Sequence, residues 1–347
     1  MAKRVLMTGN EALGEGAIRG GCDCYFGYPI TPQNELTAYM AKHLVGEGKA
    51  YIQSESEVAA INMVFGAAGA GARAMTSSSS PGISLKQEGI SYMAACRLPG
   101  LIVNVMRAGP GLGDITPSQS DYFQATRGGG HGDYRTIVYT PATVQEMHDF
   151  AVKAFEVADK YLLPVMILAD GRLGQMMEPL ELWSEDPNRV EKPWALTGAT
   201  DGREKRTIRS YYAGKVPENN EQIQATLREI EAAEVQYDTY LTDDAEFLLV
   251  GYGTSARLCR GAIDLVRAEG IKAGLVRPKT VWPFPFKIIS ELSEAAKKVL
   301  VVEMCAGQMV EDVRLAVEGR APVHFFGTLG GDVPSVGDVA EQIRNLK

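Results

Sequence analysis

The chain has 347 residues, a formal net charge of −8 and no cluster of basic residues, so a nucleic-acid or anionic-membrane surface is not expected. Its hydrophobic content of 45% is ordinary for a globular protein, and its length favours two domains. No apolar run approaches the roughly 20 residues of a membrane span, and the N-terminal segment lacks the pattern of a signal peptide. We therefore expect a cytoplasmic protein.

The first domain is expected over residues 1–184, where short β-rich runs alternate with helical stretches of ten or more residues. This alternation is typical of an α/β fold with a doubly wound parallel sheet. Strands are predicted at 23–30, 72–80, 99–107 and 163–170. Helices are predicted at 32–44, 55–71, 82–97 and 143–161.

Residues 185–240 are polar and rich in turn-forming residues, so they are interpreted as a linker with one helix, predicted over 219–237. A second, smaller α/β domain is expected over 241–347. Its strands are predicted at 245–253, 271–278, 299–305 and 322–327. Its helices are predicted at 256–270, 286–298 and 309–319.

The five cysteines are an odd number and contain no C-x-x-C pair. They are Cys22, Cys24, Cys96, Cys259 and Cys305. This spacing supports neither a disulfide framework nor a four-cysteine zinc or iron–sulfur site, and no metal site is expected in this chain. Cys22 and Cys24 are interpreted as buried small residues rather than as a redox pair.

Three polar or glycine-rich loops follow predicted strands of the first domain, at the edge where open parallel sheets bind ligands. The first, "GYPITP", places Thr31 as the predicted N-cap of the next helix and Pro32 as its first residue. The second is "SSSSPG". The third follows Arg107, for which a surface charge and a carboxylate-binding fork are about equally supported.

Glu57 begins a helix that is otherwise nearly free of charge. The helix dipole favours an acid in the first turn, and that account covers Glu55 as well. A carboxylate buried there would also need a specific hydrogen-bonding partner. "GAAGAG", "GPGLG" and "GYGTSAR" all fail the dinucleotide fingerprint, and no P-loop occurs, so a nicotinamide or P-loop enzyme is poorly supported.

Taken together, "GYPITPQNEL", "ESEVAAINMVFGAAGAGARAMTSSSSPGISL", "VNVMRAGPGLG", "QSDYFQATRGGGHGDYR" and "PVMILADGRLGQ" resemble the α-type subunit of the 2-oxoacid:ferredoxin oxidoreductases. The stretch "QSDYFQATRGGGHGDYR" is most similar to the branched-chain, or 2-oxoisovalerate, members. The resemblance implies a pyrimidine-type thiamine-diphosphate-binding domain followed by a transketolase C-terminal-like domain. It also implies oxidative decarboxylation of a 2-oxoacid, with coenzyme A as co-substrate and ferredoxin as electron acceptor.

The same resemblance implies roles for individual residues. Glu57 matches the glutamate that hydrogen-bonds the pyrimidine ring nitrogen of thiamine diphosphate, Thr31 matches a threonine that reaches the substrate or the ring, and Arg107 matches the arginine that holds the substrate carboxylate. The expected catalytic residues are these three. The expected cofactor-binding residues are Tyr28, Pro29, Ile30, Thr31, Glu57, Ser79 and Ser80.

A partner chain is expected, because the sequence contains no "GDG", the family's usual start of the metal and diphosphate grip, and its "NN" lies in the linker. A β-type subunit would bring Mg²⁺, the diphosphate grip and a [4Fe–4S] cluster; γ-type and ferredoxin-like subunits are also expected. His131 and Asp133 are expected in a loop beside the site at an interface. "GYGTSAR" is explained by a tight βα turn, and its domain is expected either to build the subunit interface or to contribute to docking coenzyme A or an electron carrier.

Two alternatives stay open. A 2-oxoglutarate enzyme would need a second cation, and Arg127, Arg135 and Arg172 are candidates. A non-catalytic scaffold subunit would retain the fold alone, although a scaffold has no evident use for Glu57.

Overall fold

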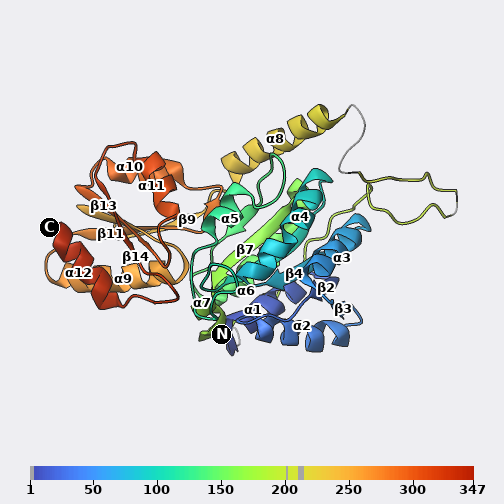
Figure 1. Ribbon diagram of the computed structural model, residues 1–347, viewed down its shortest axis with the longest axis horizontal. Coiled ribbons are helices and arrows are strands. Elements are labelled where there is room, and N and C mark those ends of the chain that lie inside the picture. The colour runs from blue at the N-terminus through green and yellow to red at the C-terminus, as the bar shows by residue number, and fades with distance from the viewer. Residues whose placement is uncertain (1–3, 201, 210–214) are drawn as a thin grey trace.

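The main sheet has seven strands in the order β12-β6-β7-β5-β4-β2-β3 (Figure 1). The computed structural model describes residues 4–200, 202–209 and 215–347. All neighbouring strands of this sheet run parallel, except β12, which is antiparallel to β6. Its strands are β2 (Cys24–Gly27), β3 (Ala50–Gln53), β4 (Ala74–Ser78), β5 (Gly100–Met106), β6 (Ile137–Tyr139), β7 (Pro164–Asp170) and β12 (Thr280–Trp282).

Helices cover both faces of this sheet, as expected for a doubly wound fold. One side carries α3 (Glu57–Gly69) and α4 (Ser80–Ala95), which pack against each other. The other side carries α1 (Gly9–Arg19), α2 (Asn34–Gly46) and α6 (Val144–Tyr161). The central strands β4, β5 and β7 are buried along their whole length. Their side chains therefore form a continuous core that holds the strand ends in place.

Shorter elements complete this part of the molecule. A two-stranded antiparallel sheet joins β1 (Arg4–Thr8) to β8 (Met177–Glu181), which follows α7 (Gly171–Gln175). The short helix α5 (Tyr122–Arg127) lies in the crossing between β5 and β6. Beyond it in the chain, α8 (Val216–Ala233) contacts α4.

The second sheet has five strands in the order β14-β13-β10-β11-β9, of which only β9 is antiparallel to its neighbour. The strands are β9 (Tyr237–Tyr240), β10 (Phe247–Val250), β11 (Ala273–Pro278), β13 (Lys298–Glu303) and β14 (Val323–Gly327). The helices are α9 (Gly253–Ala268), α10 (Phe286–Ser293), α11 (Met309–Val317) and α12 (Val336–Leu346). Both of the predicted α/β units, each a sheet with its helices, are thus present.

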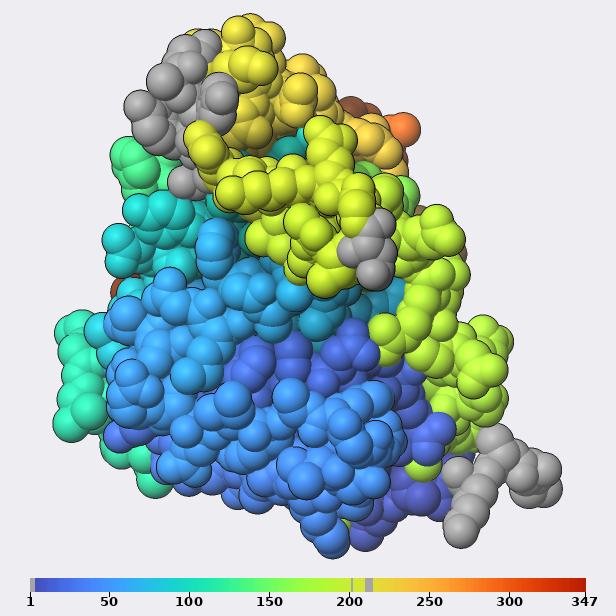
Figure 2. All heavy atoms as spheres, turned by 90° about the vertical axis from the view of Figure 1, so that its right-hand side faces the viewer, coloured from blue at the N-terminus to red at the C-terminus, as the bar shows by residue number. Residues whose placement is uncertain are grey.

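Residues 185–200 and 202–209, here called the strap, are tied to the main layer at Leu196, whose amide bonds the Gly69 carbonyl (2.9 Å), while a loop of this segment projects from the body (Figure 1 and Figure 2). Arg73 is buried and bonds Asp159 (Nε to Oδ2, 2.9 Å) and the strap carbonyl of Asn188. Lys192 of the strap pairs with the other oxygen of Asp159 (2.6 Å). A buried cation and carboxylate therefore hold the start of the predicted linker in place.

The structure differs from the sequence expectations in several elements. The sequence reading did not predict α1, α5, α7, α12, β1, β3, β6, β8, β9 or β12. β9 lies within the range assigned to the linker, and β12 lies within the range of the second domain but extends the first sheet.

Candidate functional site

The site lies at the carboxyl edge of the main sheet, where four chain segments meet; we call this region the crest. The loop 28–33 follows β2, Ser79 follows β4, Arg107 follows β5, and Glu57 begins α3 after β3. Because these strands are parallel, their ends expose loops and helix N-termini on one side. The three loops singled out from the sequence are therefore brought together.

Glu57 is the first residue of α3, and its side chain is buried, with 7% of the residue exposed. Ser56 caps the helix by accepting a hydrogen bond from the Ala59 amide (3.1 Å), so Glu57 is not needed as the cap. Among the described residues, no hydrogen bond to the Glu57 carboxylate is present. Burial without a partner is costly for a carboxylate, so the helix dipole alone does not account for this residue.

Gly82 of α4 borders the space beside the Glu57 carboxylate. A Cβ at Gly82 would collide with Ser78 Oγ and would lie 2.7 Å from Glu57 Oε1. The missing side chain therefore lets the carboxylate and the hydroxyl share one small space between α3 and α4. Gly82 is required there because any larger residue would displace one of these two groups.

Several buried polar atoms at the crest have no hydrogen-bond partner within the described part of the chain. They are Gln33 Nε2, Ser78 Oγ, Ser79 Oγ and Arg107 Nε. Buried polar groups in folded proteins nearly always find a partner, and an unpaired one costs about 1–3 kcal/mol. Several such atoms in one region are typical of a site that a ligand completes.

Arg107 and Thr31 lie together, as the resemblance implied. The Arg107 guanidinium donates to the Thr31 carbonyl (3.0 Å) and to the Leu112 carbonyl (2.8 Å), and the residue is buried. Arg107 is therefore not a surface charge. Its Nε, which has no partner, keeps one donor for a further group.

The prediction that Thr31 caps α2 and that Pro32 is its first residue is wrong. The N-cap is Gln33 and the helix begins at Asn34. Residues 30–33 form a turn in which the Gln33 amide bonds the Ile30 carbonyl (3.1 Å), so the helix starts two residues later. The Thr31 hydroxyl only accepts from the Asn34 side chain (3.2 Å), which leaves its own proton for another partner.

Ser80 differs from its neighbours, because its hydroxyl is already paired. It donates to Asp121 Oδ2 (2.5 Å) and accepts from the Arg107 amide (3.0 Å). Burial raises the pKa of Asp121, although the hydrogen bonds from Ser80 and Asn104 oppose that shift. The structure thus places Ser80 behind the crest, where it supports Arg107.

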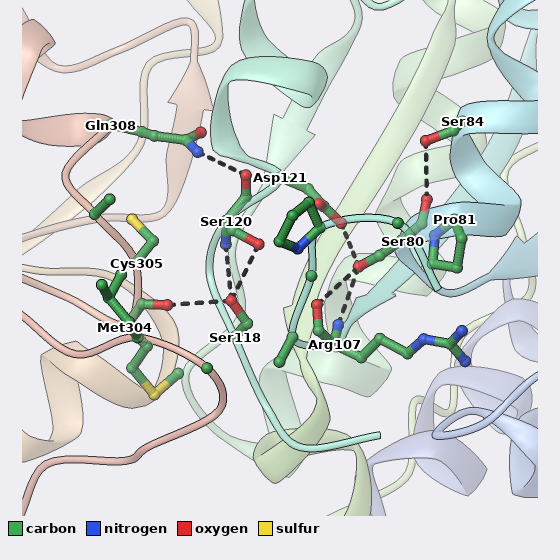
Figure 3. A pocket seen from close by; sticks show the side chains of 17 residues that line it. Ser80, Pro81, Ser84, Arg107, Ser118, Ser120, Asp121, Met304, Cys305 and Gln308 are labelled. Atoms are coloured by element: carbon green, nitrogen blue, oxygen red, sulfur yellow. Dashed lines mark hydrogen bonds between the residues drawn. The ribbon is translucent and has the colours of Figure 1, made fainter. Parts of the chain in front are cut away.

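A cavity of about 450 Å³ lies beside Ser80, between the crest and the second sheet (Figure 3). Met304, Cys305 and Gln308 line it from the second-sheet side. The Arg107 guanidinium points away from Met304 and Cys305 (Figure 3). This cavity is therefore a second space, next to the one that Glu57 and Ser78 share.

The remaining candidates occupy different positions. Tyr28 and Pro29 are exposed at the crest and Ile30 is half-buried. His131 and Asp133 are exposed and line a separate cavity of about 1,030 Å³ that α4 and α8 also border. This cavity does not contain the crest residues named above.

The three additional arginines have different surroundings. Arg127 pairs with Asp312 of α11 (2.8 Å), and Arg135 donates to the carbonyls of Arg127 and Tyr134. Arg172 is exposed on α7, whose first residue, Gly171, contacts the Pro32 ring.

The sequence reading missed Lys86. This lysine is on α4, its residue is 0% exposed, and its Nζ donates to Thr76 Oγ1 (2.7 Å) and to the Ser77 carbonyl (2.9 Å). Burial lowers the pKa of Lys86 to about 7, and the nearby charge of Glu57 opposes this shift. The available signal was its spacing, because Ile83, Lys86 and Ile90 share the buried face of a helix.

"GYGTSAR" forms the joint between the two sheets. The amide of Thr254, near the start of α9, donates to Asp170 Oδ2 (3.0 Å), and its hydroxyl donates to Oδ1 (2.7 Å). Gly253 has a positive φ of 53°, and a Cβ there would lie 2.9 Å from Asp170 Oδ2. The glycine is thus needed for close approach of the two sheets within this chain, whereas a role at a subunit interface or in docking stays a prediction.

Comparison with known proteins identifies the family. Residues 15–240 match the family described as pyruvate flavodoxin/ferredoxin oxidoreductase, thiamine diphosphate-binding. Residues 245–339 match core domain II of pyruvate:ferredoxin oxidoreductase. The chain belongs to the 2-oxoacid:ferredoxin oxidoreductase family. The resemblance stated from the sequence motifs is therefore confirmed.

Relatives within this oxidoreductase family match the chain over most of its length. It is 48% identical to the ketoisovalerate oxidoreductase subunit VorB of Methanothermobacter thermautotrophicus, covering 98% of this chain and 97% of the relative. It is 39% identical to the 2-oxoglutarate synthase subunit KorA of Archaeoglobus fulgidus, covering 93% of this chain and 95% of the relative. Both are named as subunits, so this oxidoreductase chain is similar to components of multi-subunit enzymes.

Solved structures confirm the predicted fold class. The 2-oxoglutarate:ferredoxin oxidoreductase from Magnetococcus marinus, with 2-oxoglutarate, coenzyme A and succinyl-CoA bound, has a TM-score of 0.90 and 26% identity. The match covers 99% of this chain and 65% of that one. A split-gene transketolase with a TM-score of 0.61 and 13% identity shares the fold alone.

Some donor sets are absent from the part of the chain that the structure describes. Within it, no group of three or more His, Cys, Asp or Glu side chains is arranged to hold a metal ion. All five cysteines are free, and Cys22 and Cys24 are buried. None of the described helices is both long and apolar enough to cross a membrane.

Proposed function

We propose that this chain is the pyrimidine-binding subunit of an enzyme that oxidatively decarboxylates a branched-chain 2-oxoacid, 3-methyl-2-oxobutanoate. The products are the acyl-CoA and carbon dioxide, and ferredoxin takes the electrons. The observation that carries the proposal is Glu57, a residue 7% exposed whose carboxylate has no hydrogen-bond partner among the described residues and lies beside the buried, unpaired hydroxyl of Ser78. The 48% identity to a ketoisovalerate oxidoreductase subunit supports the choice of substrate.

The crest residues fit the aminopyrimidine part of thiamine diphosphate. A ring with nitrogen donors and acceptors would give partners to Glu57 and to the unpaired hydroxyls of Ser78 and Ser79. Glu57 would hold or move the proton at the pyrimidine ring nitrogen. When bound, thiamine diphosphate supplies the electron sink for decarboxylation.

Arg107 and Thr31 are proposed to bind the substrate carboxylate. Arg107 is held by two backbone carbonyls, so its remaining N–H donors are oriented before a substrate arrives. The loops around it, 28–33 and 108–114, would exclude water from that side of the site. Tyr28, Pro29 and Ile30 would contribute surface to the same wall.

The opposite wall is proposed to come from a β-type partner subunit, which would carry Mg²⁺, the diphosphate grip and a [4Fe–4S] cluster. The missing "GDG" motif and the scattered cysteines support this division. γ-type and ferredoxin-like subunits complete the proposed complex. We expect the isolated chain to bind thiamine diphosphate weakly and to show no iron absorbance; a single chain replete with cofactor and iron would contradict the proposal.

The substrate is tested with the reconstituted complex by viologen reduction, comparing 3-methyl-2-oxobutanoate with 2-oxoglutarate. We expect the branched-chain acid to have the higher kcat/KM, because Arg127 pairs with Asp312 and Arg135 bonds two backbone carbonyls, so neither is free to hold a second carboxylate. A higher kcat/KM for 2-oxoglutarate would instead favour the second candidate. In that case Arg172→Ala should reduce the preference.

A further inference from the structure

The strand β5 has one polar side chain, Asn104, and this side chain is completely buried. A buried amide needs hydrogen-bond partners on both of its polar atoms. Asn104 Oδ1 accepts from the Ser80 amide (3.0 Å), and Nδ2 donates to Asp121 Oδ2 (2.9 Å). Ser80 Oγ donates to the same oxygen of Asp121 (2.5 Å; Figure 3). The three residues therefore form a closed ring of hydrogen bonds.

Helix capping does not account for Asp121. This residue is the N-cap of α5, yet its side chain accepts no hydrogen bond from the amides of that helix. An aspartate at an N-cap ordinarily accepts from the second or third amide of its helix. The Asp121 carboxylate is instead bonded to Ser80 and Asn104. Its hydrogen bonds therefore serve the segment that follows β4 and the strand β5.

Ser80 connects this ring to the backbone of Arg107. The Arg107 amide donates to Ser80 Oγ (3.0 Å), and the Arg107 carbonyl lies 3.3 Å from the same atom. A hydroxyl has one proton to donate, and Asp121 takes it at the shorter distance, which leaves a lone pair of Oγ for the Arg107 amide. Without the carboxylate, the proton would be free to turn toward the Arg107 carbonyl. Asp121 thus fixes the backbone from which the Arg107 side chain extends.

The second sheet holds Asp121 from the other side, through Gln308. Gln308 is the N-cap of α11, but its side chain caps no amide of that helix. Its Nε2 donates to the Ser120 carbonyl (2.7 Å), and its Oε1 accepts from the Phe123 amide (2.7 Å). These two contacts lie on either side of Asp121 in the chain. The loop that follows β13 therefore helps to set the position of Asp121.

We propose that Asp121 is a positioning residue for Arg107, and that the second domain takes part through it in binding the carboxylate of the 2-oxoacid. This inference rests on the proposed role of Arg107. The path of hydrogen bonds leads from Gln308 through Asp121 and Ser80 to the Arg107 backbone. An arginine that is oriented in advance binds a carboxylate more tightly than one that must first be ordered. Breaking the path should therefore weaken substrate binding.

The experiment compares Asp121→Ala with Asp121→Asn in the complex reconstituted with its partner subunits. Viologen reduction gives KM and kcat for 3-methyl-2-oxobutanoate, and calorimetry gives the affinity for thiamine diphosphate. We expect Asp121→Ala to raise KM about tenfold, to change kcat by less than about threefold and to leave the cofactor affinity unchanged. Asp121→Asn should recover most of the wild-type KM. Ser80 and Asn104 both bond Oδ2, and the amide oxygen of an asparagine replaces that acceptor.

Ser80→Ala breaks the same path while retaining the carboxylate, so it should raise KM as Asp121→Ala does and serves if that variant fails to assemble. The matched control is Asp312→Asn. The Asp312 carboxylate is also buried and also joins α5 to the second domain, by accepting from Tyr122 (2.5 Å) and Arg127 (2.8 Å). It makes no contact with Ser80 in the described structure. The control should lower stability and leave KM unchanged.

Three outcomes would overturn the inference alone. The first is an unchanged KM in both Asp121→Ala and Ser80→Ala. The second is an equal rise in KM in Asp312→Asn, because any loosening of α5 would then have the same effect. The third is a rise in Asp121→Asn as large as in Asp121→Ala, because the hydrogen bonds would then not be the cause. A wild-type complex that does not oxidise the 2-oxoacid would overturn the proposed function, and the inference with it.

Discussion

The joint between the sheets and the crest both bury polar side chains, but only the joint satisfies them internally. At the joint, the Asp170 carboxylate accepts three hydrogen bonds, two from Thr254 and one from the Leu173 amide. At the crest, Gln33, Ser78, Ser79 and Arg107 each keep a buried atom without a partner. Since an unpaired buried group is costly, folding completes the joint and a ligand is needed to complete the crest.

Glu303, at the end of β13 in the second sheet, is also satisfied internally. Its buried carboxylate accepts hydrogen bonds from the amides of Gln308, Met309 and Val310 at the start of α11. Burial raises its pKa, and these amide hydrogen bonds oppose the shift. Glu57 also lies at a helix start, yet its carboxylate has no such partner among the described residues. A buried acid at a helix N-terminus is therefore not in itself a sign of function.

Replacing the acid at the crest should have the largest effect. Glu57→Gln removes the proton-holding group with little change in shape, so turnover should fall about 10²- to 10⁴-fold. Viologen reduction measures the loss, and size-exclusion chromatography should show an intact complex. Glu55→Gln is the control, because Glu55 is exposed two residues earlier and should retain full activity. A fully active Glu57→Gln enzyme would favour the scaffold alternative.

Breaking the joint should reduce stability instead of chemistry. Asp170→Ala leaves the buried Thr254 amide and hydroxyl without an acceptor, and we expect a loss of about 3 kcal/mol in the free energy of unfolding. Denaturant titration measures the change. Asp244→Ala removes an exposed partner of Arg267 and should not shift the midpoint. Equal midpoints for both variants would mean that the joint does not stabilise the fold.

The pH dependence of stability should reveal Lys86. Its pKa falls from 10.5 to about 7 on folding, so the unfolded chain binds more protons between these values and stability rises with pH across that window. Lys86→Met removes this dependence. Its free energy of unfolding should exceed that of the wild type by about 2–4 kcal/mol at or below pH 7, and the difference should vanish near pH 10.5. Thermal unfolding of both proteins at several pH values measures this difference. A difference that stays constant with pH would show that burial of the Lys86 charge does not destabilise the fold.

The smallest expected effects are those of replacing Ser78 and Ser80. Ser80→Ala removes a donor to the buried Asp121 and should cost about 1–2 kcal/mol of stability. Ser78→Ala removes an unpaired hydroxyl, so it should leave the stability of the chain unchanged or slightly higher. Only Ser78→Ala should weaken thiamine diphosphate binding directly. Calorimetric binding and denaturant curves for both variants separate the two roles, and a reversed order would contradict the division between them.

The alternation of strands and helices predicted both sheets because long elements carry a clear hydrophobic period. Some of the missed elements are very short: β6 and β12 have three residues each, too few to show a period. The pairing of β12 with β6 joins residues about 140 positions apart and depends on tertiary packing. The helix α12 was also missed, although the sequence carries a signal for its start, because Ser335 and Asp338 form a capping box.

For the site, the sequence predicted which loops meet but not how each side chain is used. Thr31 has the residue type of an N-cap, yet the turn over 30–33 moves the cap to Gln33. In the serine run, adjacent hydroxyls differ, because the Ser80 hydroxyl is hydrogen-bonded and the Ser79 hydroxyl has no partner among the described residues. Contacts between distant segments decide such differences, and a single sequence does not reveal them.

The strand β12 has a practical consequence for dividing the protein. A gene split after residue 240 would remove β12 and leave the backbone groups of β6 exposed along one side of the first sheet. Bare sheet edges recruit other strands, and the same cut would remove core residues such as Trp282 and Phe284, so such a fragment should aggregate. A fragment that extends to residue 285 would keep this edge paired but would remove β13 and expose the edge of β10, so a cut at either place leaves one sheet open and the two sheets are best expressed in one chain.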